Sequence, residues 1–238
     1  MIKKIKKTIK LNNKPIADFY YKETDKTVGE ATKSFVKNYK ELISFFGVQP
    51  PKISIYFLYA RKEMDKHWGE NSKQISAMVD SKSIYVIYIF SPLVFEKLTI
   101  HKKDKITPII THETAHTFVS QINEKCFYWT NEGICQFVEN WKPDNKISKK
   151  HWNWFRKNKI LIDADISWPK VIDHQGYKIS YHLVDYIIKK YGKEAVIELL
   201  KIHRDSKDKD LEKKMAKILG GDLDKFLDDF EKNLKLMN

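Results

Sequence analysis

Hydrophobic and polar residues alternate along the first part of the chain with a period of two, which is the pattern of half-buried strands. Segment 52–59 is the clearest case, because Ile53 and Ile55 point to one side and polar or mixed residues to the other. A hairpin is expected around Asn12-Asn13, since such turn residues favour a tight hairpin connection. We expect strands at residues 4–11, 15–22, 52–59, 76–79 and 82–90.

A different spacing, with apolar residues three or four positions apart, is typical of amphipathic helices. It appears between the strands at residues 25–46 and 60–68, and it dominates from Lys105 to the end of the chain. In that last part we expect helices at residues 105–121, 131–141, 147–157, 178–191, 193–204, 208–219 and 222–236.

Because strands come first and helices last, this order predicts an α+β fold. We expect a single domain over residues 1–238, in which a mixed β-sheet N-terminal lobe (1–103) is followed by a mainly helical C-terminal lobe (104–238). The composition agrees with a folded chain that has a sizeable core, with 42% hydrophobic and 13% aromatic residues and few Gly or Pro.

Membrane and secretory signals are not evident in the sequence. No apolar run reaches the length of about 18 residues that a membrane-spanning helix needs. Residues 1–10 alternate Ile with Lys and lack the apolar segment of a secretory signal. We therefore expect a cytoplasmic protein, with Cys126 and Cys135 as reduced thiols.

The net charge of +13 raises the question of a nucleic-acid partner. Only three of the 44 basic residues are Arg, namely Arg61, Arg156 and Arg204. Arg provides the bidentate contacts that dominate base and phosphate recognition. A lysine excess spread over the whole chain therefore does not indicate a nucleic-acid-binding surface.

Segment 112–116 reads HETAH, which is the HExxH pattern of zinc hydrolases. Two His four residues apart lie on one face of a helix, so His112 and His116 can reach the same ion. Glu113 between them would act as the general base that takes a proton from water. The alternative is a solvated helix face that happens to carry His and Glu.

Glu132, in the segment WTNEG at 129–133, supplies a third ligand for such an ion. We expect it at the start of a helix that Thr130 or Asn131 caps. Glu139 follows two turns later on the same side, where it could orient a ligand His or remain an ordinary solvated carboxylate.

These motifs together resemble the gluzincin metallopeptidases, in particular the peptidase MA-like group and the catalytic domain of aminopeptidase N-type enzymes. The resemblance implies a zincin or thermolysin-like fold and one Zn²⁺ per chain, bound by His112, His116 and Glu132. It also places Asn131 and Glu139 near the ligands. The motif-rich part spans residues 112–192, and the order of strands and helices before it fits more loosely.

The resemblance extends to segment 177–186, which reads YKISYHLVDY. Family members carry a Tyr at the start of a comparable helix and a small residue three positions later. This assigns Tyr177 as the donor to the oxyanion of the intermediate and Ser180 as the small residue. Tyr181, His174 and His182 are alternative oxyanion donors, because a hydroxyl or an imidazolium can also donate there.

Two departures from the family affect specificity. The connection from His116 to Glu132 is shorter than in aminopeptidase N-type enzymes, and the Gly-x-Met-Glu-Asn segment that holds the substrate amine has no counterpart. We therefore favour an endopeptidase over an aminopeptidase. The alternative is a catalytically silent metal-binding module, regulatory or interacting, on a peptidase scaffold.

A peptide or protein substrate is expected along an exposed sheet edge, where main-chain hydrogen bonds hold an extended chain. In the resembled family this edge is formed by a strand just before the motif helix. The candidates are residues 76–79 and 82–90. The alternative is that both strands lie inside the sheet.

Overall fold

The computed structural model describes residues 4–68, 75–80, 82–144, 146–162, 168–204 and 210–237, with only the backbone for residues 168 and 169. It is an α+β protein with a mixed sheet. The chain forms two compact units, Met1–Gln121 and Ile122–Asn238, each described by itself below. The expected single domain with lobes at 1–103 and 104–238 stays a prediction.

The first unit is built on one five-stranded sheet with the strand order β1-β2-β3-β5-β4. The strands are β1 (Lys4–Leu11), β2 (Lys14–Lys22), β3 (Ile53–Leu58), β4 (Ala77–Asp80) and β5 (Ser83–Phe90). β2, β3 and β5 run parallel, whereas β1 and β4 pair antiparallel to their neighbours. All five predicted strands are therefore present, and Asn12 and Asn13 form the hairpin turn with φ of 49° and 65°.

The order of strands decides which strand lies at an edge. β5 pairs with β3 on one side and β4 on the other, so it lies inside the sheet. β4 is an edge strand. Of the two candidate edges, residues 76–79 match the edge position and residues 82–90 do not.

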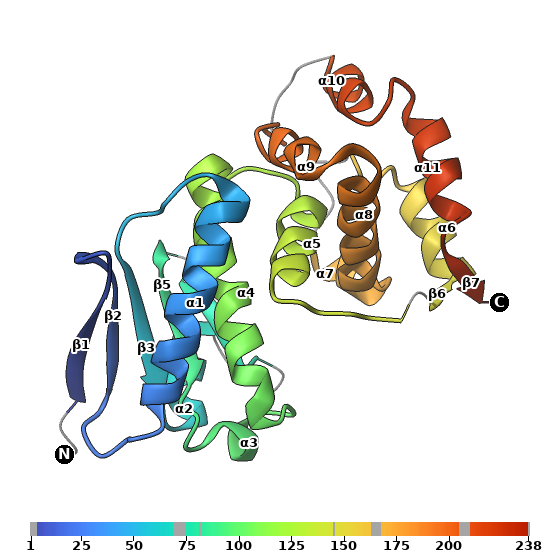
Figure 1. Ribbon diagram of the computed structural model, residues 1–238. Coiled ribbons are helices and arrows are strands. Elements are labelled where there is room, and N and C mark those ends of the chain that lie inside the picture. Colours follow the sequence, from blue (N-terminus) through green and yellow to red (C-terminus); the bar gives the residue numbers. More distant parts are fainter. Residues whose placement is uncertain are drawn as a thin grey trace. The chain divides into compact units, whose positions relative to one another are not determined.

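Two long helices, α1 (Val28–Phe46) and α4 (Ile106–Asn123), lie side by side on one face of this sheet (Figure 1). Phe118 of α4 packs against two aromatic rings of α1, with centroid distances of 5.1 Å to Tyr39 and 5.4 Å to Phe46. Asn38 donates a hydrogen bond of 2.6 Å to the hydroxyl of Thr111. These contacts fix α4, the helix that carries the HETAH segment.

Shorter elements complete the first unit. They are α2 (Arg61–Trp68), α3 (Phe95–Leu98) and one turn of 3-10 helix at Lys103–Lys105. The helices predicted at 25–46, 60–68 and 105–121 are confirmed within three residues at each end. Ser81, expected in a turn, lies outside the described residues.

A buried carboxylate joins the ends of the three parallel strands. Asp25 is 3% exposed. Its oxygens accept hydrogen bonds from the backbone and hydroxyl of Thr27, from the Tyr59 hydroxyl at 2.8 Å and from the Ser91 hydroxyl. Burial alone would raise the pKa of Asp25, but the hydrogen bonds from Ser91, Thr27 and Tyr59 outweigh burial and hold the pKa below its ordinary value of 3.8.

We expect Asp25→Asn to lower the free energy of unfolding of the first unit by about 2–3 kcal/mol near neutral pH, because four donor groups from three residues lose a charged acceptor. A carboxylate whose pKa is lowered by folding stabilises the fold above its unfolded pKa, and this contribution disappears as the pH falls. The wild type should therefore lose stability below about pH 4, and the variant should depend less on pH in this range.

Urea unfolding at several pH values, followed by hydrogen exchange of the β2, β3 and β5 amides, measures this effect. Asp104→Asn is the matched control, because Asp104 is exposed in the same unit. Equal losses of stability in the two variants would contradict the structural role of Asp25.

The second unit consists mainly of helices. They are α5 (Tyr128–Val138), α6 (Lys149–Lys157), α7 (Trp168–Asp173), α8 (Gly176–Tyr191), α9 (Lys193–Leu200), α10 (Leu211–Ile218) and α11 (Leu223–Glu231). Its core contains large aromatic residues that are at most 1% exposed, among them Trp129, Trp152, Phe155, Phe226 and Phe230. The predicted helical character of this part of the chain is thus confirmed.

Several details of the prediction are wrong, and one of them is that the helix expected at 193–204 ends at Leu200. The helix expected at 222–236 ends at Glu231, and residues Lys235–Met237 instead form β7, which pairs in parallel with β6 (Lys146–Ser148). The pairing joins segments far apart in sequence, so a local pattern does not show it. α7 was not predicted, and the helix expected at 131–141 spans 128–138. Residues 208 and 209, expected at a helix start, lie outside the described residues.

Helices α5 and α8 pack closely against each other in this unit. A Cβ atom built on Gly133 would lie 2.4 Å from the carbonyl oxygen of Ser180 and 2.8 Å from a methyl carbon of Val184. Only a residue without a side chain fits at this crossing. The small residues Gly133 and Ser180 therefore bring the helix of Glu132 against the helix of Tyr177.

In the part of the chain that the structure describes, no helix combines the length and the apolar character needed to cross a bilayer.

Candidate metal centre

The two His of the HETAH segment lie on successive turns of α4. Their rings are 4.8 Å apart between centroids and meet edge to face, with an angle of 79° between the planes. His112, Glu113 and His116 are half-buried, while Thr114 and Ala115 are buried. The buried side anchors the helix, so the three polar side chains share its more accessible side.

Glu132 lies in the second turn of α5 and is half-buried. The helix begins at Tyr128, after Phe127 in an extended conformation, and no side chain caps it. The expected cap by Thr130 or Asn131 is therefore wrong, since both residues lie inside the helix. Buried aromatic residues anchor its start instead, with the Trp129 indole N–H donating to the Leu161 carbonyl at 3.2 Å.

The candidate ligand atoms of His112, His116 and Glu132 all lie within 4.8 Å of one another. Donors that share one zinc-sized ion are at most about 4.2 Å apart, which is twice the bond length, so the separation in the structure is close to this limit. Two imidazoles and one carboxylate are a donor set that a borderline-soft divalent metal accepts. These three residues fit a metal ion by chemistry and by separation.

The cysteines do not extend this donor set. Cys126 and Cys135 are both free and buried. Burial raises the pKa of the Cys126 thiol to about 12, which opposes the thiolate form that binds metal. Cys135 donates to the Asn131 side chain at 3.6 Å.

Tyr177 and Tyr181 occupy one side of α8, four residues apart. Tyr177 is the second residue of the helix and is 36% exposed. Tyr181 contacts the rings of Trp141 and Phe137, at 5.8 Å and 6.4 Å between centroids. Burial, together with the charge of Asp185, raises the pKa of Tyr181, so its hydroxyl remains protonated and able to donate.

His174 and His182, the two alternative oxyanion donors, both form hydrogen bonds with backbone carbonyls. His182 donates from Nε2 to the Asp144 carbonyl at 2.9 Å, and burial lowers its pKa, which favours the neutral ring. His174 donates from Nδ1 to the Lys170 carbonyl at 2.8 Å and stacks on Trp154 with 3.8 Å between ring centroids. An imidazolium donor is therefore less favoured at His182 than a tyrosine hydroxyl.

Asn131 and Glu139 lie on the same helix as Glu132. Glu139 is the C-cap residue directly after α5, and its backbone N–H donates to the Cys135 carbonyl at 3.1 Å. It lies seven residues after Glu132, so the helical period places both carboxylates on the same side of α5. Its role in orienting a ligand stays a prediction.

Comparison with known proteins gives one distant relative and no family. No family model matches the chain. The chain is 21% identical to the uncharacterized protein YhcO of Bacillus subtilis (strain 168), over 92% of this chain and 70% of that protein. With 92% of the chain covered, the similarity includes most of both units.

Proposed function

We propose that this protein is a zinc-dependent peptidase with a zincin-like, thermolysin-like catalytic fold. The observation that carries the proposal is the group of ligand atoms from His112, His116 and Glu132, which lie within 4.8 Å of one another, with Glu113 beside them on α4. A bare metal-binding group needs no carboxylate between its two His, whereas hydrolysis needs a base at that position.

In the proposed reaction, each residue of the site has a separate role. A divalent metal at this site would supply Lewis acidity and lower the pKa of water to about 7. Glu113 accepts the proton of the attacking water and passes it to the leaving amine. Tyr177 donates a hydrogen bond to the developing oxyanion, with Tyr181 as the alternative hydroxyl donor.

The substrate in this proposal is an extended peptide that adds to β4. This edge strand belongs to the same sheet that supports α4, and its pairing with β5 leaves its other side without a strand partner among the described residues. Main-chain hydrogen bonds at such an edge hold a peptide with little dependence on its sequence. Binding along an edge suits internal segments of a chain, so we favour endopeptidase action.

Glu132→Ala tests the third ligand. We expect the variant to bind zinc at least 100-fold more weakly than the wild type, since even residues that only orient ligands change metal affinity by about 10–100-fold. Competition titration with a chromophoric chelator measures the affinity. Glu124→Ala is the control, because Glu124 is an exposed carboxylate in the connection just before α5. Unchanged affinity in Glu132→Ala would remove Glu132 from the site.

A further inference from the structure

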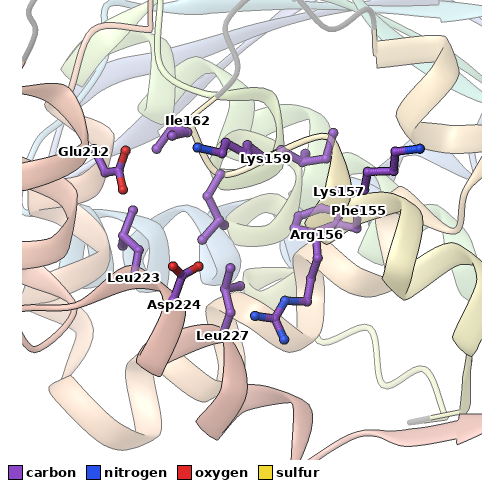
Figure 2. Close-up of a pocket in the computed structure, with 11 residues that line it drawn as sticks. Phe155, Arg156, Lys157, Lys159, Ile162, Glu212, Leu223, Asp224 and Leu227 are labelled. Carbon is purple, nitrogen blue, oxygen red and sulfur yellow. The ribbon is translucent and has the colours of Figure 1, made fainter.

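A cavity lies within the helical unit, among residues that the metal chemistry does not use. It has a volume of about 310 Å³ and opens beside the end of α6, the segment 158–162 and the start of α11 (Figure 2). Pockets for small ligands begin at roughly this size. The cavity can therefore hold a molecule of about ten non-hydrogen atoms.

The cavity is lined in part by aliphatic side chains. Ile160 and Leu161 are each 3% exposed, and Leu223 is 8% exposed. Leu227 is half-buried one turn further along α11. Such a surface favours an apolar group of the ligand over water.

Charged groups of both signs face the same cavity. Lys159 lies on one side, and Glu212 and Asp224 lie on the other (Figure 2). Figure 2 shows the ammonium end of Lys159 turned toward the side that carries Glu212. None of these three side chains forms a hydrogen bond or an ion pair with another residue in the described part of the chain.

Two neighbouring cations, in contrast, form ion pairs with carboxylates of the chain. Arg156 pairs with Asp228 at 2.8 Å and with Glu231 at 3.1 Å, so its charge is already balanced. Lys213, next to Glu212, pairs with Asp210 at 2.9 Å. Lys157 lines the cavity as well, but its ammonium points away from it in Figure 2. The charges that face the cavity and remain for a ligand are thus one cation and two carboxylates.

The backbone at Lys159 is unusual as well. Lys159 has a φ of 48° and follows the last turn of α6. The N–H of Ile160 donates to the Phe155 carbonyl and that of Lys159 to the Arg156 carbonyl, which is the Schellman pattern of helix ends. Glycine is the favoured residue at this position, because a side chain costs free energy in the left-handed region. A lysine at this position therefore lowers the stability of the fold, and its side chain lines the cavity.

We propose that this cavity binds a free α-amino acid with a large aliphatic side chain. The side chain contacts the aliphatic lining, Lys159 binds the α-carboxylate, and Glu212 and Asp224 bind the α-ammonium group. A purely anionic ligand would meet two carboxylates, and a purely cationic one would meet Lys159. Only a zwitterion with an apolar side chain satisfies every part of the lining. The site is separate from the metal ligands and does not depend on peptidase activity.

L-Leucine is the probe, tested by ligand-observed NMR on the full chain without added metal. We expect a millimolar dissociation constant, as for a small ligand in an open pocket. Three matched compounds each lack one group: 4-methylpentanoate has no ammonium, 3-methylbutylamine no carboxylate, and glycine no side chain. Each should bind at least about fivefold more weakly than leucine. No leucine binding up to roughly 50 mM, or equal binding of 4-methylpentanoate, would overturn the proposal.

Two variants test the residues. Lys159→Gly should raise the melting temperature, because glycine relieves the left-handed conformation, and yet bind leucine at least about fivefold more weakly. Glu212→Gln should weaken leucine binding to a similar extent. Lys157→Gln is the control and should bind leucine as the wild type does, since its ammonium points away from the cavity in Figure 2. Wild-type affinity in both Lys159→Gly and Glu212→Gln would show that the charges do not hold the ligand.

Discussion

Glu113→Gln is expected to reduce peptide hydrolysis by about 10³–10⁴-fold while zinc affinity stays close to that of the wild type. Glutamine has nearly the same shape as glutamate but cannot accept the proton of the attacking water, and a positioned base contributes up to about 10⁴-fold to such a step. Glu113 is half-buried on α4 between two candidate ligands and is not one of them. The substitution therefore separates proton transfer from metal binding.

Cleavage of casein or of a mixed peptide library, with and without a chelator, measures the effect. Glu124→Gln is the control, because it makes the same chemical change at an exposed position. A variant Glu113→Gln with near wild-type turnover would remove Glu113 as the base. A wild-type protein that binds one equivalent of zinc but cleaves no substrate would instead establish the alternative, a silent metal-binding module on a peptidase scaffold.

The sequence predicts the first unit well because its strands carry their own local signal. Ile53, Ile55 and Phe57 alternate with less buried residues, and the structure buries all three on the face that α1 and α4 cover. The hairpin at Asn12-Asn13 is equally local, since both residues tolerate the positive φ that the turn requires. A pattern that lies within one element can be read from the sequence.

Features that depend on distant residues could not be predicted in this way. β7 exists because Leu236 pairs with Ile147, almost ninety positions away in the chain. Its three residues also continue the spacing of α11, so the local signal favoured a helix. The cavity beside Lys159 combines α6, α10 and α11, and a lysine with positive φ is not expected from its residue type.

The candidate metal site contains one feature that follows from local spacing and another that depends on packing between distant residues. The spacing of HETAH is local to one helix, so the ring pair of His112 and His116 was predictable. Glu132 is expected as a third ligand from its residue type and its place after HETAH, but its helix begins three residues earlier than the predicted range of 131–141. Polar residues suggested a cap, but buried Phe127 and Trp129 determine the start of α5, because their packing outweighs a capping hydrogen bond.

Gly133→Ala is expected to lower the free energy of unfolding of the second unit by about 3 kcal/mol or more, since overpacking against a fixed neighbour costs about 1–3 kcal/mol and occasionally more. The added methyl group would lie 2.4 Å from the Ser180 carbonyl oxygen and 2.8 Å from its carbonyl carbon. These are backbone atoms of α8, which cannot rotate away as a side chain can. The two helices must separate, and the contacts between them weaken.

The chain offers a matched control for this prediction. Gly29 lies in the first turn of α1, and a Cβ added there meets no atom within 4 Å. Gly29→Ala should stabilise the protein by about 0.5–1 kcal/mol, because alanine loses less backbone entropy in a helix. The same Gly→Ala substitution is thus expected to lower the free energy of unfolding at position 133 and to raise it at position 29. Thermal or urea unfolding can measure both changes. Since Glu132 precedes Gly133 on α5, zinc affinity should fall in Gly133→Ala and stay unchanged in Gly29→Ala. Equal stability of the two variants would contradict the close approach of α5 to α8.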